Sequence, residues 1–391
     1  MSHVSSPPTE QQRRIESLEG LRGILASMVV FSHIQIFFFP QYASTIEALS
    51  NRLPPGLGNI AHRSMQFIVN GNLAVWTFWI LSGLVLSRRH LHGLQVHFGP
   101  IRFLATASGK RYTRLAIPVL LSVILCWLLT HSGLMFNEAL GQHYVGKHPD
   151  WTAYAAWLKD LTPPFETLTG AFKSALLDSF VAYDRATTYN PVLWTIEKEF
   201  LGSLLLFAWL YIIRSRKNAA GWSLLLIAGL IAVRQAWAAA FILGMLLNVT
   251  NYSKKQRTHW PLLSTWKASA CALALLVFAG GHPNYLGLLN LGLGAALIIS
   301  SLWLSPFRRL LSTRPMQQLG GLSFTIYLIH LPVLCTLSSW TYLSLADHAP
   351  PLAASAAASI ATLLFTLPVA AVFYRLADLP ARKISRAITQ R

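Results

Sequence analysis

The stretch GILASMVVFSHIQIFFFP, residues 23–40, decides the class of fold, because it is a long apolar run interrupted near its middle by an imidazole. An α-helix turns about 100° and rises 1.5 Å per residue. His33 therefore lies on the same stripe as Arg22, eleven residues earlier and roughly 16 Å away along the axis. If this helix spans a membrane, an ionisable side chain near the bilayer midplane is costly and indicates a partner or a function.

The composition of the whole chain is that of a helical membrane protein. Of the 391 residues, 53% are hydrophobic and only 12% are charged, whereas soluble domains carry about 25% charged residues. The N-terminus is polar and has no signal-like apolar core followed by a small-residue cleavage site, so we expect no cleaved signal. Cys126, Cys271 and Cys335 lie far apart in apolar runs and have neither metal spacing nor a disulfide pattern.

Long apolar runs predict an all-α, polytopic bundle with about ten membrane spans. The predicted spans are residues 24–40, 67–87, 116–131, 195–213, 219–233, 236–250, 262–281, 285–305, 318–342 and 352–374.

The distribution of charge predicts that both termini lie inside. With the N-terminus inside, 24 of the 32 Lys and Arg residues and 4 of the 14 acids fall on inner segments. The inner segments then carry a net charge of +20 and the outer segments −2. This asymmetry accounts for the overall charge of +18 and removes nucleic acid from the expected partners, leaving the bilayer and anionic cytosolic ligands.

No soluble domain or internal repeat is recognisable, so we expect one membrane domain over residues 1–391. It has a cytosolic tail at 1–17, a large extracytoplasmic loop at 132–194 and a basic cytosolic tail at 375–391. The loop carries Trp151, Tyr154 and Trp157 at helical spacing. These rings indicate either interfacial packing, which we favour, or an aromatic floor for a sugar.

Two arginines stand three residues apart at the predicted inner mouth of the third span. Arg111 and Arg114 fit the general rule that inner loops are basic. Together with Arg22 they also form a set of guanidinium groups that can hold the phosphates of an anionic cofactor. Near the inner end of the second span, Ser82 and Gly83 interrupt an apolar run, where small residues favour close helix packing and leave room for a ligand.

Two acids border the predicted outer end of the fourth span. Glu197 and Glu199 lie two residues apart and point to different sides of a helix. A glutamate next to hydrocarbon is a candidate for proton transfer, but an ion pair with Lys198 or a nearby arginine explains it equally well. In the ninth span, Ser323, Tyr327 and His330 share one helical face and suggest the lining of a pocket.

These motifs together resemble those of the acyltransferase family 3 membrane O-acyltransferases. LEGLRGILASMVVFSH resembles the opening signature of that family, with Arg22 and His33 at matching spacing, and FWILSGLVLSRR resembles its F-F-x-L-S-G-F segment. The remaining matches are Arg111 and Arg114 with R-x-x-R, Trp194, Thr195 and Glu199 with W-[ST]-L-x-x-E, and Ser323, Tyr327 and His330 with S-Y-x-x-Y-L-x-H.

The matches occur in family order between residues 18 and 333, with a few departures. Glu19 replaces the usual aspartate, Leu84 and Phe324 replace frequent aromatics, and Asp378 stands for the glutamate of a terminal E-x-P. Glu197 adds an acid that leaves the choice between Glu197 and Glu199 open.

The resemblance implies an O-acyltransferase in a bacterial inner membrane that moves an acyl group, by default acetyl, from cytosolic acyl-CoA to a hydroxyl of an envelope glycan such as exopolysaccharide or O-antigen. It implies no resident cofactor and no metal. Arg22, Arg111 and Arg114 would hold the CoA phosphates. His33 would act as general base or as nucleophile, and Glu199 would orient or recharge it. Ser82, Trp194, Ser323, Tyr327 and His330 would line the substrate path.

Two other classes of function remain open from the residues alone. Intramembrane His and Glu side chains also form proton relays, so a proton-coupled transporter is the alternative, although no repeat or matched broken helices support it. A non-catalytic scaffold for polysaccharide assembly would tolerate replacement of His33 and Glu199. The acceptor hydroxyl, the acyl length and the oligomeric state are not encoded in any motif that we recognise.

Overall fold

The computed structural model describes residues 10–41, 54–91, 99–162, 167–252, 266–281 and 287–388, and within these ranges the regular structure is entirely helical. The all-α prediction is therefore confirmed. Residues 1–9 and 389–391 of the predicted tails lie outside the described residues. The chain forms two compact units, each built from three separated segments. Helices α1 (Glu10–Phe38) and α16 (Arg314–Val333) each pass from one unit into the other.

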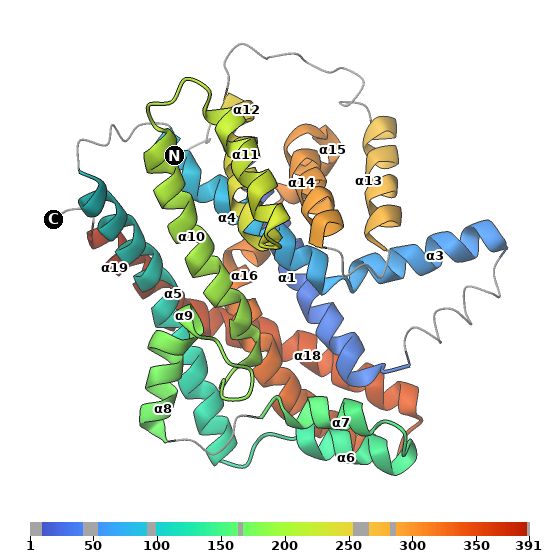
Figure 1. Cartoon of the computed structure of the whole chain (residues 1–391). Helices are drawn as coiled ribbons and strands as arrows, with labels where there is room; N and C mark the ends of the chain where they lie inside the picture. The colour runs from blue at the N-terminus through green and yellow to red at the C-terminus, as the bar shows by residue number, and fades with distance from the viewer. Residues whose placement is uncertain are drawn as a thin grey trace, which may run out of the picture. The chain divides into compact units, whose positions relative to one another are not determined.

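The first unit comprises Met1–Phe31, Ser44–Gly93 and Lys217–Ser323. Its helices, besides the first parts of α1 and α16, are α3 (Pro55–Ile68), α4 (Gly71–Leu91), α11 (Ala219–Ala232), α12 (Ala236–Tyr252), α13 (Trp266–Gly280), α14 (Gly287–Trp303) and α15 (Ser305–Leu311) (Figure 1).

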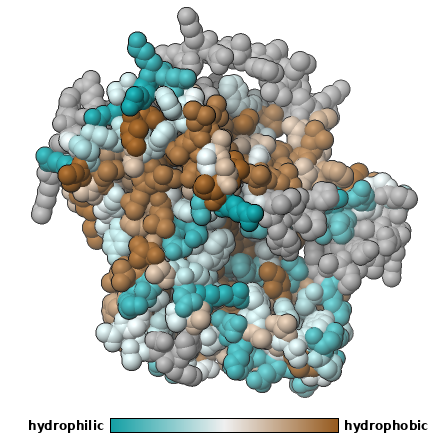
Figure 2. Space-filling model, viewed as in Figure 1, coloured by the Kyte–Doolittle hydropathy of each residue, from teal (hydrophilic) through white to brown (hydrophobic). Residues whose placement is uncertain are grey.

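Close backbone approach at glycines characterises this unit. A Cβ atom on Gly83 of α4 would overlap the carbonyl oxygen of Phe241 on α12, and one on Gly244 of α12 would overlap that of Ile80. Small residues let transmembrane helices approach closely, so the predicted packing role of the Ser82–Gly83 interruption is confirmed for Gly83. Leu224 and Leu225 of α11 are exposed, and the surface over this helix is largely apolar in Figure 2.

The second unit comprises Ser32–Ala43, Leu94–Arg216 and Phe324–Arg391. Its helices, besides the last parts of α1 and α16, are α5 (Pro100–His131), α6 (Asn137–Lys147), α7 (Thr152–Lys159), α8 (Leu168–Lys173), η1 (Ser174–Asp178), α9 (Ser179–Val181), η2 (Pro191–Leu193), α10 (Trp194–Ile213), η4 (Leu334–Ser338), α17 (Ser339–Leu345), α18 (Pro351–Phe373), η5 (Tyr374–Asp378) and α19 (Leu379–Ala387).

One face of α5 contributes a stripe of residues to the core of the second unit. Leu115, Val119 and Val123 recur at intervals of four residues and belong to one buried cluster that also contains Ile196 of α10 and Ile329 of α16. Such a stripe is what helix packing requires. Helices α6 and α7 lie side by side, and Gly141 approaches the backbone of Ala155 (Figure 1). Their outward surface is mostly hydrophilic to intermediate in Figure 2.

A helix lies at each of the ten predicted spans, but only some are long and apolar enough to cross a membrane by themselves. Among the residues that the structure describes, four stretches qualify, namely Glu16–Phe38, Pro100–His131, Arg314–Leu345 and Pro351–Ala387, and up to six qualify if each of two bent helix pairs is one span. The chain is thus an integral membrane protein with several apolar helices, while the count of ten spans, the orientation of the termini and the single-domain organisation stay predictions.

Candidate functional site

The two histidines that the sequence singled out on different helices form a pair in the second unit. His33 of α1 and His330 of α16 place Nδ1 and Nε2, respectively, 3.3 Å apart. Their ring centroids are separated by 4.9 Å and the ring planes are inclined by 59°. His330 is fully buried, whereas His33 is half-buried. The structure therefore gives the intramembrane imidazole of His33 a defined neighbour.

A proline two residues after His330 explains how this part of α16 is held. Pro332 has no backbone N–H, so the carbonyl of Leu328 lacks its usual helical donor. The side-chain amide of Asn190, itself fully buried, donates to that carbonyl at 3.0 Å. Sequence inspection missed Asn190, although an asparagine directly before Pro191 and a proline inside the predicted ninth span are both present in the sequence.

The same loop makes a second polar contact with α16. The hydroxyl of Tyr327 donates to the carbonyl of Val192 at 2.7 Å and lies 2.7 Å from the hydroxyl of Thr195. Tyr327 and Thr195 both belong to predicted motifs, and the structure brings these two motifs together. The start of α10 is thereby attached to the helical face that carries His330.

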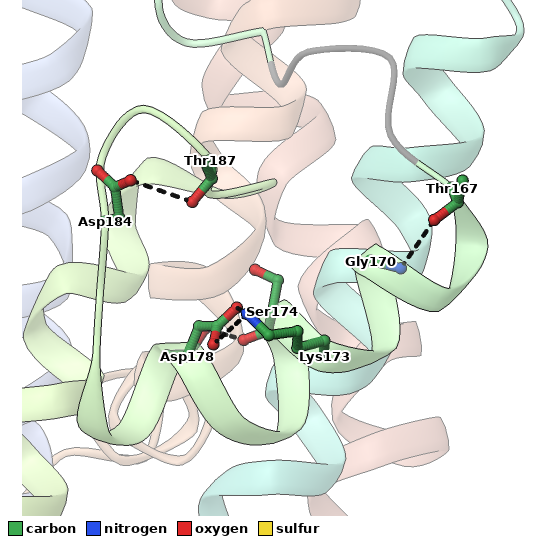
Figure 3. A network of polar contacts seen from close by, with 8 residues as sticks. Thr167, Gly170, Lys173, Ser174, Asp178, Asp184 and Thr187 are labelled. Atoms are coloured by element: carbon green, nitrogen blue, oxygen red, sulfur yellow. Dashed lines mark hydrogen bonds and ion pairs between the residues drawn. The ribbon is translucent and has the colours of Figure 1, made fainter.

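Local polar contacts order the segment that leads into this loop. Thr167 caps α8 by accepting from Gly170 N, Lys173 pairs with Asp178 at 3.0 Å, and Asp184 accepts from Thr187 (Figure 3). Beyond Figure 3, Tyr183 donates to the carbonyl of Pro191 at 3.0 Å, and burial raises the pKa of this phenol to about 12. The predicted extracytoplasmic loop is therefore structured where it meets the site.

Three hydroxyl groups cap the end of α1, about one turn beyond His33. Tyr144 of α6 donates to the carbonyl of Phe37, Tyr154 of α7 donates to that of Ile36, and Ser355 of α18 donates to that of Phe38. The last carbonyls of a helix have no intrahelical partner, so these bonds satisfy groups that would otherwise be buried and unpaired. Tyr154 of the predicted aromatic set thus contacts the end of α1, while the choice between interfacial packing and a floor for a sugar stays a prediction.

Arg111 and Glu199 form an ion pair, and Arg111 also donates through Nε to Ser203 at 3.0 Å. This corrects the expectation that the two residues lie at opposite membrane faces. The reason is that α5 begins at Pro100, sixteen residues before the predicted span, so Arg111 lies well inside the helix instead of at its mouth. Glu197 pairs with its neighbour Lys198 at 2.7 Å.

Arg114 belongs to a buried charge cluster. Its Nη1 lies 2.7 Å from Oδ1 of Asp378, and Nη2 of Arg382 lies 2.7 Å from Oδ2 of the same carboxylate. Asp378 is fully buried, while both guanidinium groups are about one quarter exposed. Sequence inspection noted Asp378 only as a departure from a family pattern and missed Arg382, although their spacing of four residues was a signal.

The remaining predicted residues occupy separate positions. Arg22 pairs with Glu19 at 3.5 Å in the first unit, on the same continuous helix as His33. Ser82 is half-buried in α4, and Trp194 is partly exposed at the first position of α10. The hydroxyl of Ser323 is buried and has no hydrogen-bond partner among the described residues.

Comparisons with known proteins point to one family. The family model of acyltransferase family 3, described as an acyltransferase domain, matches residues 15–375. A curated relative, the O-acetyltransferase PaAT-1 of Phomopsis amygdali, is 22% identical over an alignment of length 375; the match covers 82% of this chain and 72% of that protein. No solved structure matches.

Proposed function

We propose a reaction for this chain from the premise that it belongs to acyltransferase family 3 and is a membrane O-acyltransferase. The chain transfers an acyl group, by default acetyl, from cytosolic acyl-CoA to a hydroxyl of an envelope glycan. The observation that supports the proposal best is the imidazole pair of His33 and His330, since an imidazole on an apolar helix can accept a proton. The family model covers residues 15–375 and so includes both histidines. An imidazole pair of which one ring is buried and the other half-buried suits proton transfer from a hydroxyl group.

The donor would be held through its phosphates by arginines. The cluster of Arg114, Asp378 and Arg382 contains two positive charges and one negative charge, so it retains a net charge of +1. Partly exposed guanidinium groups bind phosphate bidentately, which fits the anionic nucleotide end of CoA. Arg111 and Arg22 are the other proposed donor-binding residues, and Glu199 would act by holding Arg111 in place.

The acyl group would travel along α1. Eleven residues separate Arg22 from His33, which corresponds to roughly 16 Å of helix rise. An extended pantetheine arm fits this separation, so phosphates near Arg22 would place the thioester near His33. Ser82, Trp194, Ser323 and Tyr327 remain proposed lining residues of the path.

Two chemical routes remain at His33. As a general base, its imidazole takes the proton of the acceptor hydroxyl while the oxygen attacks the thioester carbonyl; the carbon–sulfur bond breaks, and the imidazolium protonates the leaving CoA thiolate. As a nucleophile, the imidazole first forms an acyl-imidazole and releases CoA, and the hydroxyl then attacks that intermediate. The acceptor would approach from the side of residues 132–194, in a bacterial inner membrane with both termini inside.

Transfer of a labelled acetyl group tests the proposal. Purified protein in detergent is incubated with acetyl-CoA carrying radioactive acetyl and with p-nitrophenyl glycosides as acceptor probes. We expect transfer by the natural chain and a fall of roughly 10²–10⁴-fold for His33→Ala, because the proton acceptor is lost.

His348→Ala is the matched control, since His348 is an exposed histidine and its replacement leaves the imidazole pair intact. The control should keep the natural rate. Full transfer by a folded His33→Ala protein would contradict the assignment of His33, and absence of any transfer from acetyl-CoA by the natural chain would contradict the proposed donor.

A further inference from the structure

We propose that His330 is a positioning residue that fixes the tautomer of His33, so that Nε2 is the nitrogen of His33 that takes the hydroxyl proton. The inference rests on the proposed function, in which His33 reacts. It assigns to His330 a role different from lining the substrate path, and it is carried by the two contacts that the two ring nitrogens of His330 make.

The first contact fixes the proton of His330. Its Nδ1 lies 3.2 Å from the carbonyl oxygen of Ile326, one turn earlier in α16. A backbone carbonyl can only accept a hydrogen bond, so Nδ1 of His330 must carry the proton. In a neutral imidazole with its proton on Nδ1, the lone pair is on Nε2.

The second contact determines which nitrogen of His33 carries the proton. Nε2 of His330 faces Nδ1 of His33 at 3.3 Å, and because Nε2 is the acceptor, Nδ1 of His33 must donate. The neutral His33 ring then carries its own lone pair on Nε2. When Nε2 takes a proton, the bond from Nδ1 to His330 becomes charge-assisted and stronger, so His330 stabilises the imidazolium as it forms.

The surroundings of His330 keep this geometry fixed. The ring is fully buried, Asn190 holds the carbonyl that Pro332 leaves without a donor, and Tyr327 is bonded to Val192. A base that is oriented by hydrogen bonding of its second nitrogen is the arrangement used in catalytic triads, where a carboxylate does this work. Here the backbone carbonyl of Ile326 and the imidazole of His330 take the place of that carboxylate. The carboxylate of Glu199 forms an ion pair with Arg111 instead.

A pair of nearly isosteric substitutions separates positioning from packing. Gln and Met have similar length and volume, but only the Gln amide oxygen accepts a strong hydrogen bond from Nδ1 of His33. We expect His330→Met to lower kcat for acetyl transfer roughly 10–100-fold, which is the loss seen when groups that orient metal-bound imidazoles are replaced, with KM for acetyl-CoA changed less than about threefold. His330→Gln should restore at least one third of the natural kcat.

The controls are His348→Met and His348→Gln at the exposed histidine, together with size-exclusion chromatography to show that each variant is folded. Equal kcat values for folded His330→Met and His330→Gln, or a loss that appears only in KM, would overturn the positioning role while leaving an activity that depends on His33. If the natural chain transfers no acetyl group from acetyl-CoA, or if His33→Ala remains active, the proposed function fails and this inference fails with it.

Discussion

Helices α4 and α12 of the first unit and helices α5, α10 and η5 of the second show two ways of joining helices in a membrane protein. The first pair meets through Gly83 and Gly244, whose missing side chains let the backbones touch. The second group meets through charged side chains, with Arg111 on Glu199 and Arg114 on Asp378. Close packing and polar contacts are the two interactions that hold transmembrane helices together, because lipid removes the hydrophobic driving force for their association.

The two kinds of helix contact differ in whether they leave side chains that can bind ligands or transfer protons. A contact made of glycine and backbone fixes a distance but supplies no donor, acceptor or charge. A contact made of partly buried arginines, carboxylates and imidazoles costs desolvation and must therefore be completed by its partners, yet it leaves groups that bind anions and move protons. Arg111, Arg114 and His330 belong to contacts of the second kind, and each kind of contact can be tested separately.

The largest effect on stability is expected at the glycine contact. In Gly244→Ala, the new Cβ would overlap the Ile80 carbonyl and lie 2.7 Å from the backbone nitrogen of Leu84, and neither atom can move without shifting α4. We expect a loss of about 3 kcal/mol or more, or failure to fold, because overpacking a close contact displaces backbone. Thermal unfolding followed by tryptophan fluorescence in detergent measures this.

The matched control is Gly229→Ala in α11, where a Cβ would meet nothing within 4 Å. Alanine is the better helix former, so this variant should be unchanged or stabilised by up to about 1 kcal/mol. Equal midpoints for the two alanine variants would mean that α4 and α12 are not held by the glycine approach.

A smaller loss of stability is expected in the charged contact. Asp378→Asn removes the carboxylate that two guanidinium groups share, leaving their positive charges uncompensated next to α5. Because both arginines are partly exposed, we expect about 2 kcal/mol, which is less than for a fully buried pair. The unfolding midpoint measures this change.

Asp178→Asn provides the comparison, since the pair of Asp178 with Lys173 is largely exposed and should contribute no more than about 1 kcal/mol. A cost at Asp378 as small as that at Asp178 would contradict the structural importance of the buried cluster.

The smallest effect concerns pH and lies outside the membrane-spanning helices. Burial lowers the pKa of His143 below its usual 6.5, Lys147 lowers it further, and Asp347 acts in the opposite direction. The unfolded chain therefore binds a proton more readily than the folded chain, so stability falls as pH drops through and below about 6.5. His143→Gln should make this decline shallower, which unfolding midpoints between about pH 5 and 7.5 would measure.

The effect is expected to be small because the His143 ring is only half-buried. An unchanged pH profile in the glutamine variant would show that other groups account for the decline.

The sequence alone determined the helical class, the membrane environment and the family. Hydropathy and helical periodicity are local properties, so the run at 23–40 and the stripe from Arg22 to His33 could be recognised without neighbours. The motifs that resemble acyltransferase family 3 are likewise short segments. Helix ends were less predictable, since α1 and α5 continue into polar residues on the inner side of their predicted spans, at Glu10 and Pro100.

Only the tertiary structure decided which polar groups meet. Arg111 and Glu199 are 88 residues apart in the chain, Arg114 and Asp378 are 264 apart, and His33 and His330 are 297 apart. No local pattern specifies such pairs, because each depends on how separate helices pack within the unit. The sequence therefore identified the residues that carry a charge or an imidazole. Helix packing determined that Arg111 is the partner of Glu199 and that His330 is the partner of His33.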